Sequence, residues 1–361
     1  MNLEVCRKIG DLLMNNKPSN LGLTNGTAGI SIFLYCLSRN LSDDSYAEYA
    51  DSLLEDIYEN VAFIKDSTAD MIGMGWCFEY LIQNKFCDGN ADEILEQIDN
   101  RVYRIMSEED RRRSLDLTHG GLVGYLHYLI IRLKNKEDTN NSEEINVELF
   151  KLTINLISQE ALDHFMNLAK DINFSLWDNL YILLLGITDA YSLNIYNEKI
   201  LNMLRQWESH WTSYIPGIHF NRLYLALNLY RINRILKSRK TNEYIKTLLF
   251  SLDINSLRSE VNVERCQSIN TGYLGLIFVL KKSISILDPS YPNYTLLRPL
   301  MNEISDLCNS HLLLELDKIS EGNCRMGDYD LGIVNGWAGV GLFLLQNPEI
   351  MENCNTYKFT T

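Results

Sequence analysis

One short phrase recurs along this chain and constrains its fold more than any other feature. LGLTNGTAGISIFLY at residues 21–35 is echoed by LGIVNGWAGVGLFLL at residues 331–345. Two further copies, LTHGGLVGYLHYLIIRL (117–133) and INTGYLGLIFVLKKS (269–283), share the same GxxG core followed by an apolar run. A sequence motif that recurs several times along a chain predicts a stack of repeated supersecondary units.

The spacing of the copies predicts seven repeats of about 50 residues each. Gly75 in MIGMGWCFEYLIQN takes the place of the second glycine in a weaker copy, so that second glycines fall at Gly29, Gly75 and Gly124. The interval from Gly124 to Gly275 fits three such gaps. Two degraded copies fill it, FSLWDNLYILLLGITDAY (174–191) and YIPGIHFNRLYLALNLYRI (214–232).

The segments between the copies have the pattern of amphipathic helices. SYAEYADSLLEDIYENVAFI (45–64), for example, places apolar residues three and four positions apart with acidic residues between them. The chain shows little strand signal, so we expect an all-α protein with one inner and one outer helix per repeat. Because the first and last copies match, whereas an open solenoid needs atypical polar caps at its ends, a closed ring is favoured.

Each inner helix is expected to begin at its GxxG core. Asn25 and Asn335 precede the first glycine and are candidate N-cap residues. The glycines that follow would let the backbone of a neighbouring element pass close to the first helical turn.

Length and composition permit one large domain or two. Because the repeats continue past the polar segment 134–146, a single domain over residues 1–350 is favoured, followed by a tail at 351–361. The chain has 361 residues, 46% of them hydrophobic, and a formal net charge of -14. Such a charge disfavours DNA, RNA and anionic membranes, which need a positive surface, and suits a cationic peptide.

The cysteines and the apolar runs predict a cytoplasmic protein. Eight cysteines are scattered without a CxxC pair, as expected of reduced thiols. The N-terminal MNLEVCRKIGDLLMNN lacks the apolar core of a signal peptide. The longest apolar run, residues 180–187, is too short to span a bilayer.

Seven GxxG helical hairpins resemble the lanthionine synthetase C-like family, over almost the whole chain. DYDLGIVNGWAGVGLFLL and LGLTNGTAGISIFLYCL carry the most specific part of the resemblance. It implies an α/α toroid of seven helical hairpins in two concentric rings. It also implies a role in modifying ribosomally made peptides, where a cyclase adds a cysteine thiol to a dehydrated serine or threonine. The family's zinc, held by two cysteines and a histidine, would activate that thiol.

The zinc ligands implied by the resemblance cannot be carried over to this sequence. The family's CHG motif corresponds to Asn270, Thr271 and Gly272, and no WCxG motif occurs in the fifth repeat, which offers only His219. Alignment of the glycines places Gly120, rather than His119, at a histidine position. Other potential ligands near the repeat joints, Cys266 and Cys324, lack the close spacing of a zinc site. No metal site and no cofactor is therefore expected.

Residues at the starts of the inner helices would face the central cavity of a toroid. Asp116, His119 and His219 are the candidates for acid–base catalysis. The candidates for substrate binding are Asn25, Asn270, Thr271, Asp328, Asp330, Asn335 and Trp337. Helix capping is the competing interpretation for Asp116 and Asp330.

The leading hypothesis is a lanthionine synthetase C-like protein that binds a precursor peptide or a partner enzyme and assists thioether formation without zinc. The missing ligands leave open whether it is an enzyme. One alternative is a carbohydrate-active α/α toroid hydrolase that uses Asp116 with Asp328 or Asp330 as a carboxylate pair. Another is an interaction scaffold without chemistry. The sequence does not specify the oligomeric state.

Overall fold

In a computed structural model of the chain, the described residues are 2–61, 68–134, 141–168, 174–260, 268–320, 327 and 330–347. Helices form the regular structure of these ranges, and no strand occurs among them. The chain divides into two compact units, one of Met1–Asn60, Asn173–Leu176 and Leu252–Thr361 and one of Val61–Ile172 and Trp177–Ser251. The tail predicted at 351–361 lies outside the described residues, and the single domain over 1–350 stays a prediction.

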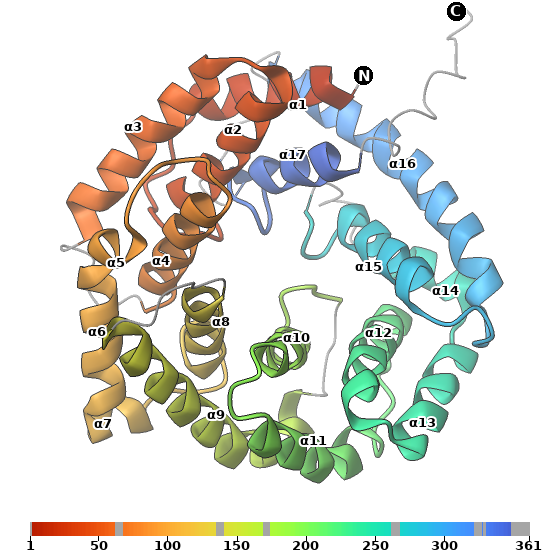
Figure 1. The fold of residues 1–361 in the computed structure, drawn as a ribbon. Coiled ribbons are helices and arrows are strands. Elements are labelled where there is room, and N and C mark those ends of the chain that lie inside the picture. Colours follow the sequence, from red (N-terminus) through yellow and green to blue (C-terminus); the bar gives the residue numbers. More distant parts are fainter. Residues whose placement is uncertain are drawn as a thin grey trace, which may run out of the picture. The chain divides into compact units, whose positions relative to one another are not determined.

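The first unit joins the two ends of the chain (Figure 1). Helix α2 packs against α3, α15 packs against α16, and α17 packs against both α1 and α2. The first and last copies of the phrase are therefore neighbours, and the last hairpin pairs α17 with the N-terminal α1. The helices of this unit are α1 (Asn2–Met14), α2 (Thr27–Leu41), α3 (Asp44–Asn60), α14 (Ile254–Ser259), α15 (Tyr273–Ile286), α16 (Tyr294–Ser320) and α17 (Trp337–Gln346).

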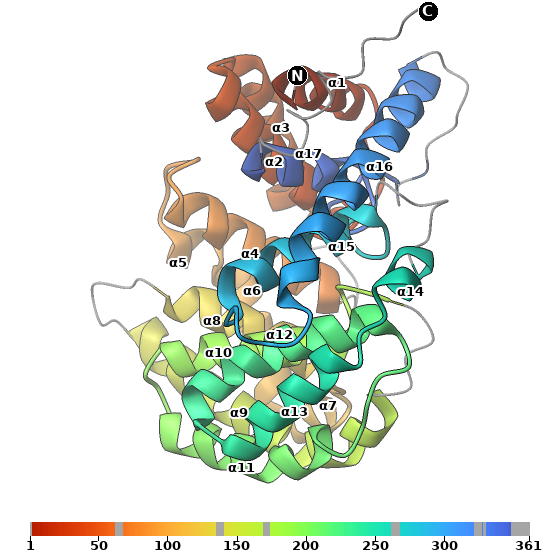
Figure 2. The same cartoon turned by 90° about the vertical axis from the view of Figure 1, so that its right-hand side faces the viewer.

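The second unit holds the remaining inner helices, which pack in the order α4, α8, α10, α12. Helix α9 covers α8, α11 packs against α9 and α12, and α13 covers α12, as Figure 2 shows for the α12–α13 hairpin. The helices are α4 (Thr68–Gln83), α5 (Ala91–Ile94), α6 (Glu96–Ser107), α7 (Glu109–Arg113), α8 (Leu122–Leu133), α9 (Asn141–Leu168), α10 (Asn179–Ser192), α11 (Asn197–Trp211), α12 (His219–Leu236) and α13 (Arg239–Phe250).

The register predicted for the second repeat was wrong. Helix α4 begins at Thr68, so Gly75 lies in the middle of the helix and not in its first turn. The third residue of α4 is Asp70, at the position that Gly29 holds in α2. Gly75 has a packing role, because a Cβ built on it would lie within 3.0 Å of the Tyr128 ring of α8.

The predicted N-caps were also wrong by one residue. The N-caps of α2 and α17 are Gly26 and Gly336, in extended conformation, and neither helix has a side-chain cap. Carbonyl groups of the preceding loop serve instead: Thr27 N donates to Asn20 O at 3.0 Å and Leu122 N donates to Asp116 O at 2.8 Å. Each loop thus folds back over its own helix and satisfies N–H groups that lack a partner within the helix.

This fold-back explains why the second glycine of the repeat is glycine. A Cβ added to Gly29, Gly124, Gly275 or Gly339 would lie within 3.0 Å of a carbonyl oxygen in the preceding loop of the same repeat. The close approach predicted between neighbouring elements is thus mainly an approach within each repeat. Gly332 is different, because a Cβ there would meet the backbone of Thr24 and Asn25, in the loop before α2.

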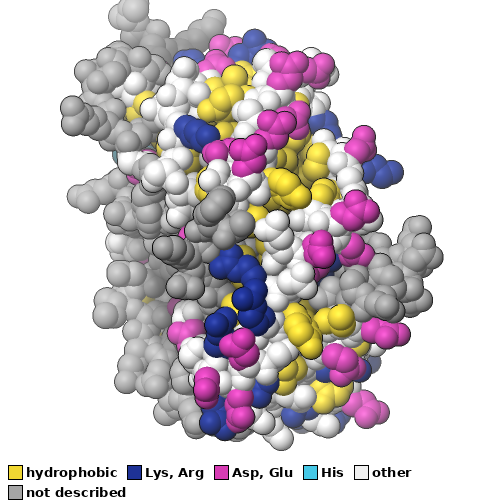
Figure 3. Space-filling model, turned by 90° about the vertical axis from the view of Figure 1, so that its left-hand side faces the viewer, with side chains coloured by type: hydrophobic (Ala, Val, Ile, Leu, Met, Phe, Trp, Pro, Cys, Tyr) yellow, Lys and Arg dark blue, Asp and Glu magenta, His cyan; other side chains and the backbone are white. Residues whose placement is uncertain are grey.

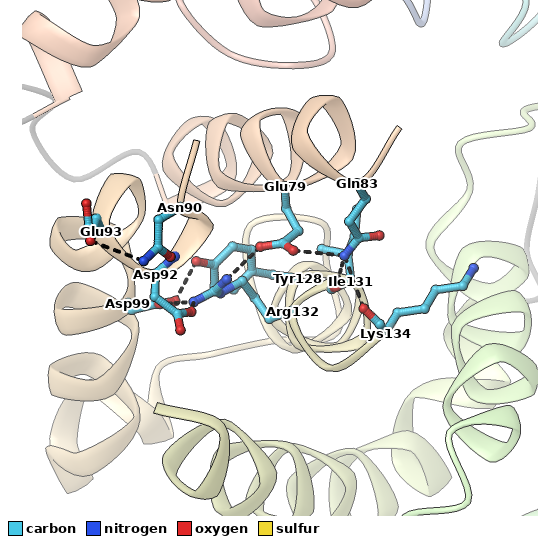
Figure 4. A network of polar contacts seen from close by, with 10 residues as sticks. All are labelled: Glu79, Gln83, Asn90, Asp92, Glu93, Asp99, Tyr128, Ile131, Arg132 and Lys134. Carbon is cyan, nitrogen blue, oxygen red and sulfur yellow. Dashed lines mark hydrogen bonds and ion pairs between the residues drawn. The ribbon is translucent and has the colours of Figure 1, made fainter. Parts of the chain in front are cut away.

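A buried arginine ties four helices of the second unit together (Figure 4). Arg132 of α8, with no exposed side-chain surface, forms ion pairs with Glu79 of α4 at 2.6 Å, Asp92 of α5 at 2.7 Å and Asp99 of α6 at 2.6 Å. The Tyr128 hydroxyl donates to Asp99 at 2.6 Å. One guanidinium therefore compensates three carboxylates that are mostly removed from water.

On the face drawn in Figure 3, acidic side chains are spread among apolar and basic ones. Within the described ranges, no helix is both long and apolar enough to cross a membrane.

We expect Gly332→Ala to lower the free energy of unfolding by about 2 kcal/mol, because the new methyl group meets backbone atoms that cannot rotate away. The matched control is Gly217→Ala, since a Cβ on Gly217 meets nothing within 4 Å. Urea denaturation measures both. Equal stability of the two variants would contradict the proposed contact between the loops.

We expect Arg132→Leu to cost about 3–5 kcal/mol at neutral pH, because three carboxylates lose their counter-charge in a buried setting. Urea denaturation at neutral pH measures the loss. The exposed Arg205→Leu serves as control, with an expected change of about 0.5 kcal/mol or less.

Candidate functional site

The loops that precede the inner helices of the first unit are joined by backbone hydrogen bonds. Val334 N donates to Thr24 O at 3.1 Å, which links the loop before α17 to the loop before α2. Asn270 N donates to Val334 O at 3.1 Å, and Leu176 N donates to Asn270 O at 2.9 Å. This run of bonds places three segments that carry predicted binding residues side by side.

Three of the predicted binding residues belong to one uncharged polar network. The Ser268 hydroxyl donates to Asn335 Oδ1 at 3.2 Å and accepts the backbone N–H groups of Asn270 and Thr271 at 3.1 Å each. The Ser175 hydroxyl donates to Asn270 Oδ1 at 2.6 Å. Amides and hydroxyls, rather than charges, therefore line this part of the first unit.

The other predicted binding residues of the first unit have different settings. Asn25 is half-buried, and its Oδ1 has no hydrogen-bond partner among the described residues. Trp337 is 2% exposed, so its indole packs within the unit. The Asp330 carboxylate accepts the Gly327 N–H at 3.1 Å and closes a turn. Asp328 lies outside the described residues.

Asp116 in the second unit also closes a turn. Its carboxylate accepts the backbone N–H and the hydroxyl of Thr118, at 3.2 and 2.5 Å, while its carbonyl accepts Leu122 N. Asn20 has the same place before α2, where its Oδ1 accepts Gly22 N at 2.6 Å. Asn20, Asp116 and Asp330 are thus turn-forming residues of equivalent loops.

His119 has the most defined chemical state among the catalytic candidates. Its Nε2 lies 2.7 Å from Trp177 O, and its ring packs on the Trp177 indole with centroids 4.8 Å apart. Because a carbonyl only accepts, Nε2 carries the proton and Nδ1 is the basic nitrogen of the neutral ring. Burial lowers the pKa of His119, the Trp177 bond opposes that shift, and nearby His127 adds to it.

His219, the first residue of α12, is held by an arginine. Arg222 Nη1 lies 3.2 Å from His219 Nδ1 and 2.7 Å from Ser251 O, while Nε donates to Pro216 O at 2.6 Å. Since a guanidinium only donates, Nδ1 of His219 accepts this bond. None of the described contacts joins His219 to His119 or Asp116.

The residues at the family's zinc positions do not fit the metal. Asn270 and Thr271 supply an amide, which accepts from Ser175, and a hydroxyl, which lies 3.4 Å from the Ser268 hydroxyl. Among the residues that the structure describes, no group of three or more His, Cys, Asp or Glu is arranged to hold a metal ion. Cys266 and Cys324 lie outside those residues.

Several residues of these loops were not predicted from the sequence. Ser268 and Ser175 organise the polar network, Trp177 fixes the state of His119, and Arg222 holds His219. The equivalence of Asn20, Asp116 and Asp330 could have been found from their place five or six residues before the first glycine. Trp177 acts through its backbone carbonyl, which leaves no sequence signal. Arg222 lies three residues after His219 on the same helix, a spacing that the sequence does show.

Comparison with solved structures assigns the class of fold. "Nisin cyclase" matches with a TM-score of 0.64 and 16% sequence identity, over 96% of this chain and 93% of that chain. The likeness confirms the prediction of an all-α fold of the α/α toroid class with seven helical hairpins.

Comparison with family models finds one similar family. The family model described as "Lanthionine synthetase C-like protein" matches residues 17–180. The match covers a little less than half of the chain, so residues 17–180 are similar to this family. No curated protein matches it in a direct sequence search.

We expect His119 to titrate below about 6.5, the usual histidine value, with the proton of the neutral ring on Nε2. Two-dimensional nitrogen–proton NMR over a pH series measures both properties. Trp177→Ala should raise the midpoint, because it uncovers the ring and relieves the burial that disfavours the charged form. A wild-type midpoint above about 6.5, or a proton on Nδ1, would contradict this assignment.

Proposed function

We propose that this chain serves a pathway that modifies ribosomally made peptides, and that it binds the precursor peptide without holding zinc. The observation that carries the proposal is the combination of a fold shared with nisin cyclase over nearly the whole chain and an uncharged network at the zinc positions. The similarity of residues 17–180 to the lanthionine synthetase C-like model supports a peptide as the ligand.

The first unit offers groups suited to a peptide main chain. Asn25 presents a buried acceptor without a partner among the described residues. Its loop is linked by backbone hydrogen bonds through Val334 to the loop of Asn270 and Thr271. A peptide N–H is a suitable donor for such an acceptor, because a buried oxygen left unbonded costs free energy. Asn335 and Trp337, at 7% and 2% exposed, would support the binding loops from within.

His119 is the residue that would assist chemistry, if a thiol reaches its Nδ1. The neutral imidazole takes the proton of a cysteine thiol, and the sulfur forms a bond to the β-carbon of a dehydrated serine or threonine. The carbanion left at the α-carbon then takes up a proton, so that the addition is balanced. His119 suits the first step because its Nε2 is committed to Trp177 O and its lowered pKa keeps the ring neutral near pH 7.

The hydrolase alternative gains no support from the carboxylates. Asp116 and Asp330 each bond within their own loop, and Asp328 lies outside the described residues. A scaffold without chemistry shares the binding groups and differs only in the step assigned to His119.

The proposal is tested with a fluorescent synthetic peptide that contains one dehydroalanine and one cysteine. We expect binding to persist in chelator, and Asn25→Ala to weaken it by about three- to tenfold through loss of one hydrogen bond. The exposed Asn202→Ala on α11 is the matched control and should bind as wild type. Fluorescence anisotropy measures these affinities.

Ring formation is followed separately by loss of the alkylatable thiol. His119→Gln should retain binding and reduce ring formation to the uncatalysed rate. Absence of ring formation with the wild-type chain would leave a binding protein and remove the role of His119. Failure of the peptide to bind, or one zinc per chain in metal analysis with activity abolished by chelator, would contradict the proposal.

A further inference from the structure

The turn between α12 and α13 carries a concentration of positive charge. Its exposed basic side chains are Arg234 at the end of α12, Lys237 in the turn, and Arg239 and Lys240 at the start of α13. We call these four residues the basic turn. Figure 2 shows the α12–α13 hairpin from its outer side.

The charge of this region opposes that of the whole chain. Residues 231–246 contain six Lys or Arg and one Glu, a formal charge of +5, whereas the chain carries -14. None of the four side chains forms an ion pair within the described residues. Glu243 pairs with Lys246 at 2.9 Å, and the Glu208 carboxylate, which feels the charge of Lys240, is bonded to Thr241 at 2.6 Å. The turn therefore keeps an excess of positive charge.

Two of these positive charges lie at the N-terminus of a helix, where positive charge is unfavourable. Arg239 and Lys240 are the first two residues of α13, and no acidic residue lies in its first turn. A positive charge at a helix N-terminus opposes the helix dipole, at a cost of a few tenths of a kcal/mol or more. Helices α1, α3, α4, α9 and α11 instead have acidic residues in their first turns. Residues that lower local helix stability without adding a stabilising contact are typical of functional sites.

The backbone of the turn is fixed, which holds the charges in place. Lys237 adopts a left-handed conformation, and its N–H donates to Asn233 O at 2.8 Å. Ser238 N donates to Asn233 Oδ1 at 2.8 Å, and the Ser238 hydroxyl donates to Glu208. Ordering the turn on binding therefore costs little entropy, which favours affinity.

We propose that the basic turn binds an acidic segment of a polypeptide. Opposite charges attract over about 8–10 Å at physiological salt, so a short acidic segment feels mainly this turn. A nucleic acid or an anionic membrane extends well beyond that distance and meets the repulsion of the rest of a chain of charge -14. The segment belongs to a partner protein or to a peptide, and its acidic side chains are the feature that is recognised.

The experiment uses the full chain and a fluorescein-labelled octaglutamate peptide, with anisotropy as readout. We expect saturable binding that weakens as salt rises from about 50 to about 300 mM, and a loss of roughly tenfold or more in Arg239→Glu/Lys240→Glu. This variant is expected to fold, because glutamates in the first turn of α13 favour the helix dipole. Its thermal midpoint should equal or exceed that of the wild type.

The matched control is Arg104→Glu/Arg113→Glu, which makes the same change in net charge on the exposed surfaces of α6 and α7. It should bind octaglutamate within about twofold of wild type, since it is remote from the turn in sequence and lies on other helices. An equal loss in both variants would assign the binding to net charge and overturn the proposal, as would no binding to the wild type.

Two further probes decide the class of ligand. An RNA oligonucleotide and vesicles containing phosphatidylserine are titrated under the same conditions. We expect neither to bind as tightly as octaglutamate. If one binds more tightly and loses its affinity in Arg239→Glu/Lys240→Glu, the turn is a nucleic-acid or membrane site and the proposal is wrong. Because the peptide of the proposed function is assayed separately, failure of either proposal leaves the other in place.

Discussion

The structure depends on the way each loop folds back over the first turn of the helix that follows it. Backbone carbonyls of Asn20 and Asp116 satisfy the exposed N–H groups at the starts of α2 and α8. Such an approach leaves no room for a Cβ on the second glycine. The loops are thereby fixed and can bond to one another, from Thr24 through Val334 and Asn270 to Leu176. The hydrogen bonds that cap the helices therefore also hold the loops of the candidate site of the first unit in place.

The same arrangement holds the polar network at the positions that the resemblance assigns to zinc ligands. A zinc ligand must project from a fixed loop with a free thiolate or imidazole. At the corresponding positions this chain has Asn270 and Thr271, whose hydrogen bonds join the loop to Ser175 and Ser268. In the second unit, burial of Arg132 with three carboxylates stabilises the helices without contributing to the candidate site.

Sequence patterns predicted the fold better than the site. GxxG and the apolar runs located α2, α8, α15 and α17, because a glycine requirement repeats wherever the same backbone approach repeats. Gly75 misled the register of α4, since a glycine needed for packing against Tyr128 looks the same in sequence as one needed for a helix start. Asn25 and Asn335 were expected to cap helices, but the carbonyls of the loop do so.

The sequence by itself determined the repeated helices, the match between the ends of the chain and the absence of the family's zinc motifs, because each is written in residue type and spacing. Only the tertiary structure decided that α17 pairs with α1 and α2, that Asp116 and Asp330 close turns, and that Trp177 sets the proton of His119. The last of these joins residues 58 positions apart through a backbone carbonyl. Because every residue has a backbone carbonyl, the side chains in the sequence do not indicate which carbonyl accepts the hydrogen bond from His119.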